Sequence, residues 1–305
     1  MNASPSASNP ATEGEASDVR RGVSLWSDLF VLTKARLSLM VVFTTSVGFC
    51  VGAEGSWMGW GLFFSVLGTS LAAASAAVLN QVLEIQVDER MERTKNRPLP
   101  QRRMRPLFAV LLGALLGGAG VGLLWFYSTV QASFLAAATI LIYLFVYTPL
   151  KRKSAWCTWV GAVSGAIPPV IGWAGTGSTQ YWQAWVLFGI LFLWQIPHFL
   201  AIAWLYKHEY ENAGLVMLSK KDDTGIFTAS QTVLFCIFLC ALAGVPLFFG
   251  DMKSFYGIGA GVVNVLLLGS SVVFLLERSR VSARRLFFAS ILYLPAMLLV
   301  FAFAI

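Results

Sequence analysis

Three side chains that carry oxygen recur every four residues between positions 80 and 88. They are Asn80, Glu84 and Asp88. Because an α-helix makes one turn in about 3.6 residues, a step of four rotates only about 40° past a full turn, and all three oxygens are expected on one helix face. Mg²⁺ takes oxygen ligands and is usually held by one or two carboxylates together with substrate phosphates. The spacing therefore predicts a magnesium site at the end of a helix.

Basic residues follow this oxygen-rich stripe directly. Arg93, Lys95 and Arg97 occupy alternate positions, and their side chains can bind phosphate oxygens through charge-assisted hydrogen bonds. Stripe and bases together indicate a metal-bridged diphosphate. A polar helix end followed by ordinary loop bases is the simpler alternative, but it leaves Asn80 and Glu84 unexplained within an otherwise apolar run.

The composition decides what kind of elements must position these residues. Hydrophobic residues make up 57% of the 305 residues and charged residues only 12%, against about 25% charged residues in soluble domains. The mean hydropathy is +0.70. A soluble globular enzyme is therefore excluded, and an integral membrane protein is predicted. The formal net charge of +7 is expected from basic loops on one side of a membrane, so no nucleic acid is expected as a partner.

Nine apolar runs approach the roughly 20 residues that a helix needs to cross a bilayer. We therefore predict an all-α fold, a polytopic membrane helix bundle of nine transmembrane helices. Residues 25–305 are expected to form this single transmembrane domain, after a disordered cytosolic tail at residues 1–24. The predicted spans are centred on Val42, Gly68, Gly117, Ile140, Ala166, Phe192, Leu239, Leu267 and Leu294.

The basic residues set the expected orientation of this bundle. With the N-terminus in the cytosol, all but Lys253 of the 22 Lys and Arg residues fall on the cytosolic side, as the positive-inside rule requires. No charged residue lies in the middle of a span, so the chemistry is expected at the cytosolic mouth. Two cytosolic connections, residues 85–105 and 206–225, are longer than most connections in compact bundles. They predict a cap over a cavity.

The N-terminal tail bears on the compartment. It carries Glu13, Glu15 and Asp18 before its first base, Arg20, whereas a mitochondrial transit peptide is rich in Arg and poor in acids. We therefore expect a bacterial cell inner membrane, with the active site facing the cytosol, rather than an organelle.

Three blocks of the sequence resemble one family. The stripe at residues 80–88, followed by E-R-T-K-N-R-P-L at residues 92–99, is similar to the first motif of the UbiA superfamily of intramembrane prenyltransferases, in the form found in its haem-modifying branch. The resemblance extends from about residue 32 to the C-terminus. The other matching segments of that branch are Y-T-P-L-K-R at 147–152, G-A-I-P-P-V-I-G-W at 165–173, W-Q-I-P-H-F at 194–199 and Y-K-H-E-Y-E-N-A-G-L-V-M at 206–217.

The resemblance implies a reaction and its cofactor. A farnesyl group would pass from farnesyl diphosphate to the 2-vinyl group of haem B, with addition of water to give haem O. Mg²⁺ would assist the loss of diphosphate at the cytosolic mouth. Haem A synthase or terminal oxidase assembly is implied as a partner, and the lipid bilayer as the setting.

The resemblance also implies roles for particular residues. Glu84 stands where most members of the superfamily have Asp, and Glu209 where the haem branch usually has Asp. Both keep a carboxylate one methylene further from the backbone. The implied metal ligands are Asn80, Glu84, Asp88 and Glu209, and with Lys95 they form the expected catalytic set. The implied substrate-binding residues are Arg93, Arg97, Tyr147, Lys151, Arg152, Trp194, His198 and Tyr206, with His198 as a haem contact.

Two alternatives stay open at this point. Another member of the superfamily, acting on a quinone precursor or a chlorin, would share the first motif, but Glu84 and the W-Q-I-P-H-F segment argue against it. A polytopic transporter without catalysis would place polar groups at mid-membrane and contain inverted repeats. The sequence shows neither feature.

Overall fold

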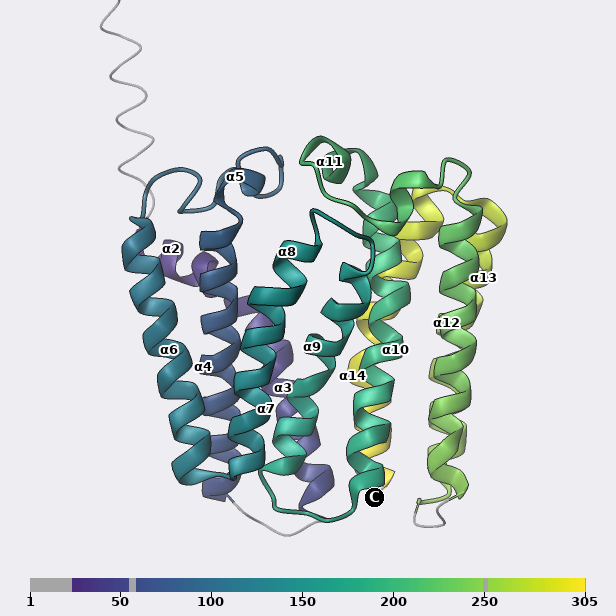
Figure 1. The fold of residues 1–305 in the computed structure, drawn as a ribbon. Coiled ribbons are helices and arrows are strands. Elements are labelled where there is room, and N and C mark those ends of the chain that lie inside the picture. The colour runs from purple at the N-terminus through teal and green to yellow at the C-terminus, as the bar shows by residue number, and fades with distance from the viewer. Residues whose placement is uncertain (1–23, 55–58, 249–251, 305) are drawn as a thin grey trace, which may run out of the picture.

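The computed structural model describes residues 24–54, 59–248 and 252–304. Within these ranges every long element is a helix, and the long helices run side by side as a bundle (Figure 1). The all-α prediction is confirmed. The predicted tail, residues 1–24, lies outside the described residues apart from Ser24, so its disorder stays a prediction.

Eight helices of the described chain are long and apolar enough to cross a membrane. The protein is therefore a polytopic membrane protein. The eight are α4 (Gly59–Leu83), α6 (Pro106–Tyr127), α7 (Val130–Leu141) continued by η1 (Ile142–Tyr147) and α8 (Thr148–Leu150), α9 (Cys157–Ala174), α10 (Tyr181–Leu205), α12 (Ile226–Gly244) continued by η3 (Val245–Phe248), α13 (Phe255–Glu277) and α14 (Arg280–Ala304).

The expected first span corresponds to α3 (Ala35–Gly52). Its apolar part, Ser38–Gly52, is shorter than the other candidates. At about 1.5 Å per residue it rises about 22 Å, against a hydrocarbon core about 30 Å thick. The count of nine transmembrane helices is therefore not confirmed, although α3 packs along both α4 and α9 within the bundle.

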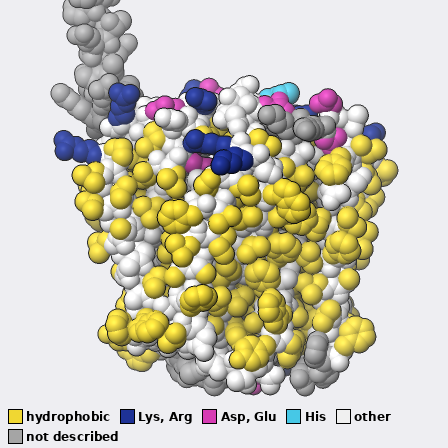
Figure 2. Space-filling view, viewed as in Figure 1, with side chains coloured by type: hydrophobic (Ala, Val, Ile, Leu, Met, Phe, Trp, Pro, Cys, Tyr) yellow, Lys and Arg dark blue, Asp and Glu magenta, His cyan; other side chains and the backbone are white. Residues whose placement is uncertain are grey.

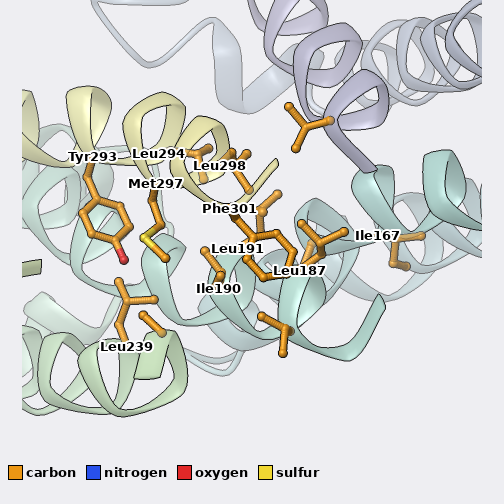
Figure 3. Close-up of a cluster of buried hydrophobic side chains, with 14 of the residues drawn as sticks. Ile167, Leu187, Ile190, Leu191, Leu239, Tyr293, Leu294, Met297, Leu298 and Phe301 are labelled. Carbon is orange, nitrogen blue, oxygen red and sulfur yellow. The ribbon is translucent and has the colours of Figure 1, made fainter. Parts of the chain in front are cut away.

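The surface of the bundle divides into apolar sides and a charged end. On the side shown in Figure 2, hydrophobic side chains cover most of the surface, and charged side chains gather at the end that carries α5 (Ile85–Asp88) and α11 (Lys207–Asn212). Large exposed hydrophobic side chains also occur along each of the eight long helices except α9. Inside, α10, α12 and α14 pack through buried apolar side chains. Figure 3 shows this cluster, which includes Leu187, Ile190, Leu239, Leu294, Met297 and Phe301. The bundle thus has lipid-compatible sides around an apolar interior.

Small residues let α3 and α9 approach each other closely. A Cβ atom placed on Gly172 would lie 1.9 Å from the carbonyl oxygen of Thr45, and one placed on Gly48 would lie 1.9 Å from that of Pro169. Lipid supplies no hydrophobic force between helices, so close backbone packing of this kind drives their association. The contact between α3 and α9 therefore depends on these two glycines.

We expect Gly172→Ala to lower the thermal midpoint of the detergent-solubilised protein clearly, because a methyl group forced into a packed interface costs about 1–3 kcal/mol. Gly118→Ala is the matched control, since a Cβ at Gly118 meets nothing within 4 Å. Circular dichroism during heating measures both midpoints. Equal midpoints for the two variants would contradict the close packing of α3 on α9.

A short π-helix joins α7 to α8. The amide of Thr148 donates to the carbonyl oxygen of Tyr143, five residues earlier, and the next residue, Pro149, has no amide hydrogen to give to a regular helical bond. Turns of π-helix occur frequently at functional sites. This one brings Tyr143 and Tyr147 to the wall of a single cavity.

The two long connections pack against each other over the charged end. Val87 and Met91 of the first connection form an apolar cluster, here called the cap cluster, with Tyr210, Ala213 and Leu215 of the second. α5 and α11 lie together at this end in Figure 1. Because residues of both connections line a cavity, the predicted cap is confirmed.

Candidate active site

A cavity of about 330 Å³ lies next to the cap cluster. Its wall is formed by the start of α3, the end of α4 with α5, the π-helix and the lysine after α8, the start of α9, the second half of α10 and residues of both long connections. Polar and charged groups therefore converge on one space at the charged end of the bundle. On the wall these groups are Lys34, Asn80, Glu84, Asp88, Arg93, Thr94, Arg97, Tyr143, Tyr147, Lys151, Thr158, His198 and Tyr210.

The oxygen-rich stripe faces this cavity, although one continuous helix does not carry it. α4 ends at Leu83, Glu84 adopts φ −108° and ψ 11°, and α5 begins at Ile85. Backbone hydrogen bonds from Glu84 to Asn80 (3.0 Å) and from Asp88 to Glu84 (2.8 Å) keep the four-residue spacing across the break. The three side chains therefore share one wall, as the sequence predicts.

Each carboxylate of the stripe is paired with a cation. Lys151 Nζ donates to both oxygens of Glu84, at 2.9 and 3.1 Å. Arg97 Nη1 donates to both oxygens of Asp88, at 2.9 and 2.7 Å. The two acidic side chains are only 9% and 5% exposed, and a buried carboxylate is costly unless it is paired. The ion pairs therefore offset the cost of burying both carboxylates in the cavity wall.

Lys151 is fixed from several sides. Its Nζ lies 4.4 Å from the centre of the Tyr147 ring, and its carbonyl oxygen accepts a hydrogen bond of 2.8 Å from the amide of Val216. Burial lowers the pKa of Lys151, but the Tyr147 hydroxyl and the hydrogen-bonded Glu84 carboxylate raise it by more, so the pKa lies above its ordinary value. Lys151 is therefore cationic at neutral pH.

The side-chain amide of Asn80 is oriented by its neighbours. The hydroxyl of Thr148 donates to the carbonyl oxygen of Tyr143 at 2.8 Å, so the same hydroxyl oxygen accepts from Asn80 Nδ2 at 3.0 Å. The amide oxygen is then free to face Lys34, whose Nζ lies 3.4 Å away. Asn80 thus presents its oxygen, and not its nitrogen, to cationic partners.

Lys34 is a cavity residue that the sequence analysis missed. It directly precedes α3 in a left-handed conformation, with φ 49° and ψ 47°, which costs a residue other than glycine about 1–2 kcal/mol. The only signal in the sequence is one lysine before an apolar run, and the positive-inside rule already explains it. Together with Arg93, Arg97 and Lys151, it gives the wall four cations.

The α10 side of the cavity is apolar apart from one histidine. Phe199, Ile202 and Ala203 line it together with His198. Trp194 lies one helical turn before His198, and the two rings stack with centroids 5.1 Å apart. Trp194 is therefore not on the cavity wall but packs behind it, against the wall residue His198.

Two predicted phosphate contacts, Lys95 and Arg152, lie outside the wall. Lys95 forms an ion pair with Glu92 near the surface. Arg152 is exposed, and its Nη2 lies 3.4 Å from the carbonyl oxygen of Leu83. Lys95 and Arg152 are therefore not on the wall, although the residues next to them in the sequence, Thr94 and Lys151, are. Adjacent side chains of an irregular connection face in different directions.

Two further predicted residues belong to the second connection. The Tyr206 ring lies 5.4 Å from the guanidinium of Arg93 and packs onto the cap cluster. Glu209 is on α11, where its Oε2 is buried without a hydrogen-bond partner in the described part of the chain. Neither residue is on the cavity wall. Among the residues that the structure describes, no three His, Cys, Asp or Glu side chains are grouped as a metal site.

Comparison with known proteins assigns the family. Residues 41–292 match the UbiA prenyltransferase family. The chain belongs to this family. Two similar proteins, both named protoheme IX farnesyltransferase, come from Solibacter usitatus and Opitutus terrae. The first is 39% identical over 88% of this chain and 95% of its own length, and the second is 40% identical over 90% and 92%.

The UbiA fold is also visible in the comparison with solved structures. A UbiA homolog from Archaeoglobus fulgidus, solved with DMAPP and Mg²⁺, aligns with a TM-score of 0.64 over 90% of this chain and 99% of that one. Its sequence is 14% identical, so the likeness concerns the fold alone. The helical bundle described above is thus an arrangement that this family uses.

The stripe of this UbiA family member has the chemistry that a divalent cation requires. Mg²⁺ prefers carboxylate and amide oxygens, which Asn80, Glu84 and Asp88 carry on one wall. Both carboxylates are buried and each is paired with a cation, so a metal ion would bind them in competition with Arg97 and Lys151. Three protein ligands leave coordination positions for water and substrate phosphates. The residues present therefore fit Mg²⁺ together with a diphosphate.

Proposed function

We propose that this protein transfers the farnesyl group of farnesyl diphosphate to the 2-vinyl group of protohaem IX (haem B) to give haem O. Family membership and the two relatives named protoheme IX farnesyltransferase support the proposal. The structural observation that carries it is the cavity wall, where two buried ion pairs meet an apolar surface from α10. An anionic head group and an apolar substrate both find a complementary surface there.

The proposed reaction has two bond-forming steps. The bond between farnesyl C1 and the diphosphate oxygen breaks, and its electron pair leaves with the diphosphate. The terminal vinyl carbon forms the new carbon–carbon bond, after which water adds to the neighbouring carbon and loses a proton. Mg²⁺, when bound, acts as a Lewis acid toward the departing diphosphate. The protein contributes positive charge that is in place before the bond breaks, which is usually the largest catalytic effect.

We assign the diphosphate to the four cations of the wall. Arg97 and Lys151 donate to the carboxylates at 2.7–3.1 Å, and phosphate oxygens compete for the same donors. When these cations bind phosphate, Glu84 and Asp88 are released to bind the metal, with Asn80 as the third ligand. The predicted roles of Lys95, Arg152, Trp194, Tyr206 and Glu209 stay predictions.

We also propose a location and a place in metabolism. A bacterial inner membrane, with the capped end in the cytosol, agrees with the position of every Lys and Arg except Lys253 under the nine-span topology. The product would then be consumed by haem A synthase or during assembly of a terminal oxidase.

The test is to incubate the purified protein in detergent with haem B, farnesyl diphosphate and Mg²⁺, and to analyse the haem by mass spectrometry. We expect a new haem that is heavier by one farnesyl group and one hydroxyl group, and EDTA should prevent its formation. If no new haem forms while a phenolic acceptor is prenylated, the protein acts on a quinone precursor instead.

A further inference from the structure

His198 is the polar side chain that α10 contributes to the cavity wall. Its ring stacks with those of Trp194 and Phe287, with centroid distances of 5.1 Å to both and interplanar angles of 22° and 26°. Both neighbours are nearly parallel to the imidazole. The stacking therefore fixes the plane of the ring, and only its two nitrogens are left to define its chemistry.

One of these nitrogens, Nδ1, is accounted for by Ser290. Nδ1 lies 2.8 Å from Ser290 Oγ. The single hydroxyl hydrogen of Ser290 is directed to the carbonyl oxygen of Phe287, 2.6 Å away. A carbonyl oxygen only accepts, so turning the hydroxyl toward Nδ1 would leave two oxygens in contact without a hydrogen between them. Ser290 Oγ therefore accepts, Nδ1 carries the proton, and Nε2 holds an unshared electron pair.

Ser290 fixes the surroundings as well as the tautomer. Its carbonyl oxygen accepts a hydrogen bond of 2.7 Å from Trp194 Nε1, so one residue of α14 holds both stacked rings of α10. The other nitrogen, Nε2, has no hydrogen-bond partner among the described residues. It is also not fully buried, because it is absent from the set of fully buried atoms without a partner. His198 lines the cavity, so an Nε2 acceptor without a partner among the described residues is suited to a ligand there.

We propose that Nε2 of His198 binds the iron of the haem substrate and that Ser290 acts as its positioning residue. The inference rests on the proposed function, because it requires haem as the acceptor. Histidine ligates haem iron as a neutral imidazole, and a ligating imidazole characteristically donates its other N–H to a fixed acceptor. The bond is dative, from the Nε2 electron pair to iron, and it requires no oxidant, reductant or proton transfer.

The experiment is a titration of the full chain in detergent with ferric haem B, without farnesyl diphosphate or added Mg²⁺. We expect the wild type to give the absorption and electron paramagnetic resonance spectra of a nitrogen-ligated haem. His198→Ala should lose this signature and weaken haem binding by about tenfold or more, and added imidazole should restore the spectrum. His208→Ala is the control, because His208 is 91% exposed on α11, and its spectrum should match the wild type.

Ser290→Ala separates positioning from packing. Without an acceptor for Nδ1–H, the iron–nitrogen stretch of the ferrous complex should shift in resonance Raman spectra, and haem affinity should fall by about 10- to 100-fold. Ser290→Thr keeps the hydroxyl and should keep the wild-type frequency. A loss of packing alone would lower affinity without moving this frequency.

Several outcomes would overturn the proposal. The proposal is overturned if the haem complex of the wild type has no nitrogen ligand. This result does not depend on whether any variant folds. An unchanged spectrum in folded His198→Ala does the same. In both cases continued formation of the farnesylated haem leaves the proposed function standing. Failure of the proposed function appears differently, as a wild type that neither binds haem nor converts it.

Discussion

Replacing Asp88 with asparagine should lower kcat/KM by about 1000-fold, close to the largest effect of removing one electrostatic contact in an enzyme site. Asparagine keeps the size of the side chain but loses the negative charge that holds Arg97 at 2.7 and 2.9 Å. A neutral amide also binds a divalent cation much less strongly than a carboxylate does. The rate of haem farnesylation at saturating and limiting Mg²⁺ measures the effect.

Glu92→Gln is the control for Asp88→Asn. Glu92 belongs to the same connection, but its side chain is 76% exposed and pairs with Lys95 at the surface. An exposed ion pair contributes about 0–1 kcal/mol, so activity and stability should stay close to the wild type. Near-normal turnover in Asp88→Asn, with circular dichroism unchanged, would remove Asp88 from the metal site.

Lys151→Met should destabilise the protein and also weaken binding of the prenyl donor. The substitution leaves the Glu84 carboxylate, 9% exposed, without its cation, and breaking a buried pair in this way costs about 3–5 kcal/mol. Loss of one phosphate contact should raise KM for farnesyl diphosphate at the same time. Thermal unfolding and steady-state kinetics in detergent measure the two effects separately. Arg152→Gln, at the exposed neighbouring position, is expected to leave the thermal midpoint unchanged.

The double variant Lys151→Met/Glu84→Gln distinguishes the two effects of Lys151. Removing both charges removes the uncompensated carboxylate, so most of the lost stability should return. Activity should not return, because a metal ligand and a phosphate contact are then both missing. If Lys151→Met alone is as stable as the wild type, the ion pair of Lys151 and Glu84 does not stabilise the fold.

The sequence predicts local features of this protein well. Membrane-spanning segments are visible as runs of apolar residues along the chain. The predicted span centres all lie within helices of the bundle. The stripe was also readable, because the backbone bonds between Asn80, Glu84 and Asp88 preserve the four-residue spacing even though α4 ends before Glu84. Patterns that repeat within one or two turns survive a small break in a helix.

Features that depend on distant contacts were not readable. The partner of Glu84 is Lys151, from the far end of α8, and the partner of Asn80 is Lys34, before α3. No periodicity links residues so far apart in the chain. The family resemblance groups Glu209 with the stripe; in the structure Glu209 lies on α11 and is not among the residues of the cavity wall, so its role as a metal ligand stays a prediction.

The cations of the wall also influence how the site is filled. Lys34, Arg93, Arg97 and Lys151 outnumber Glu84 and Asp88 by four to two, an excess of two positive charges. A free divalent cation is repelled by such a wall, whereas a multiply charged diphosphate is attracted to it. Metal affinity should therefore rise once the prenyl donor has arrived. Because such coupling is reciprocal, Mg²⁺ should raise the affinity for the prenyl donor by the same factor, so donor and metal are expected to fill the site together.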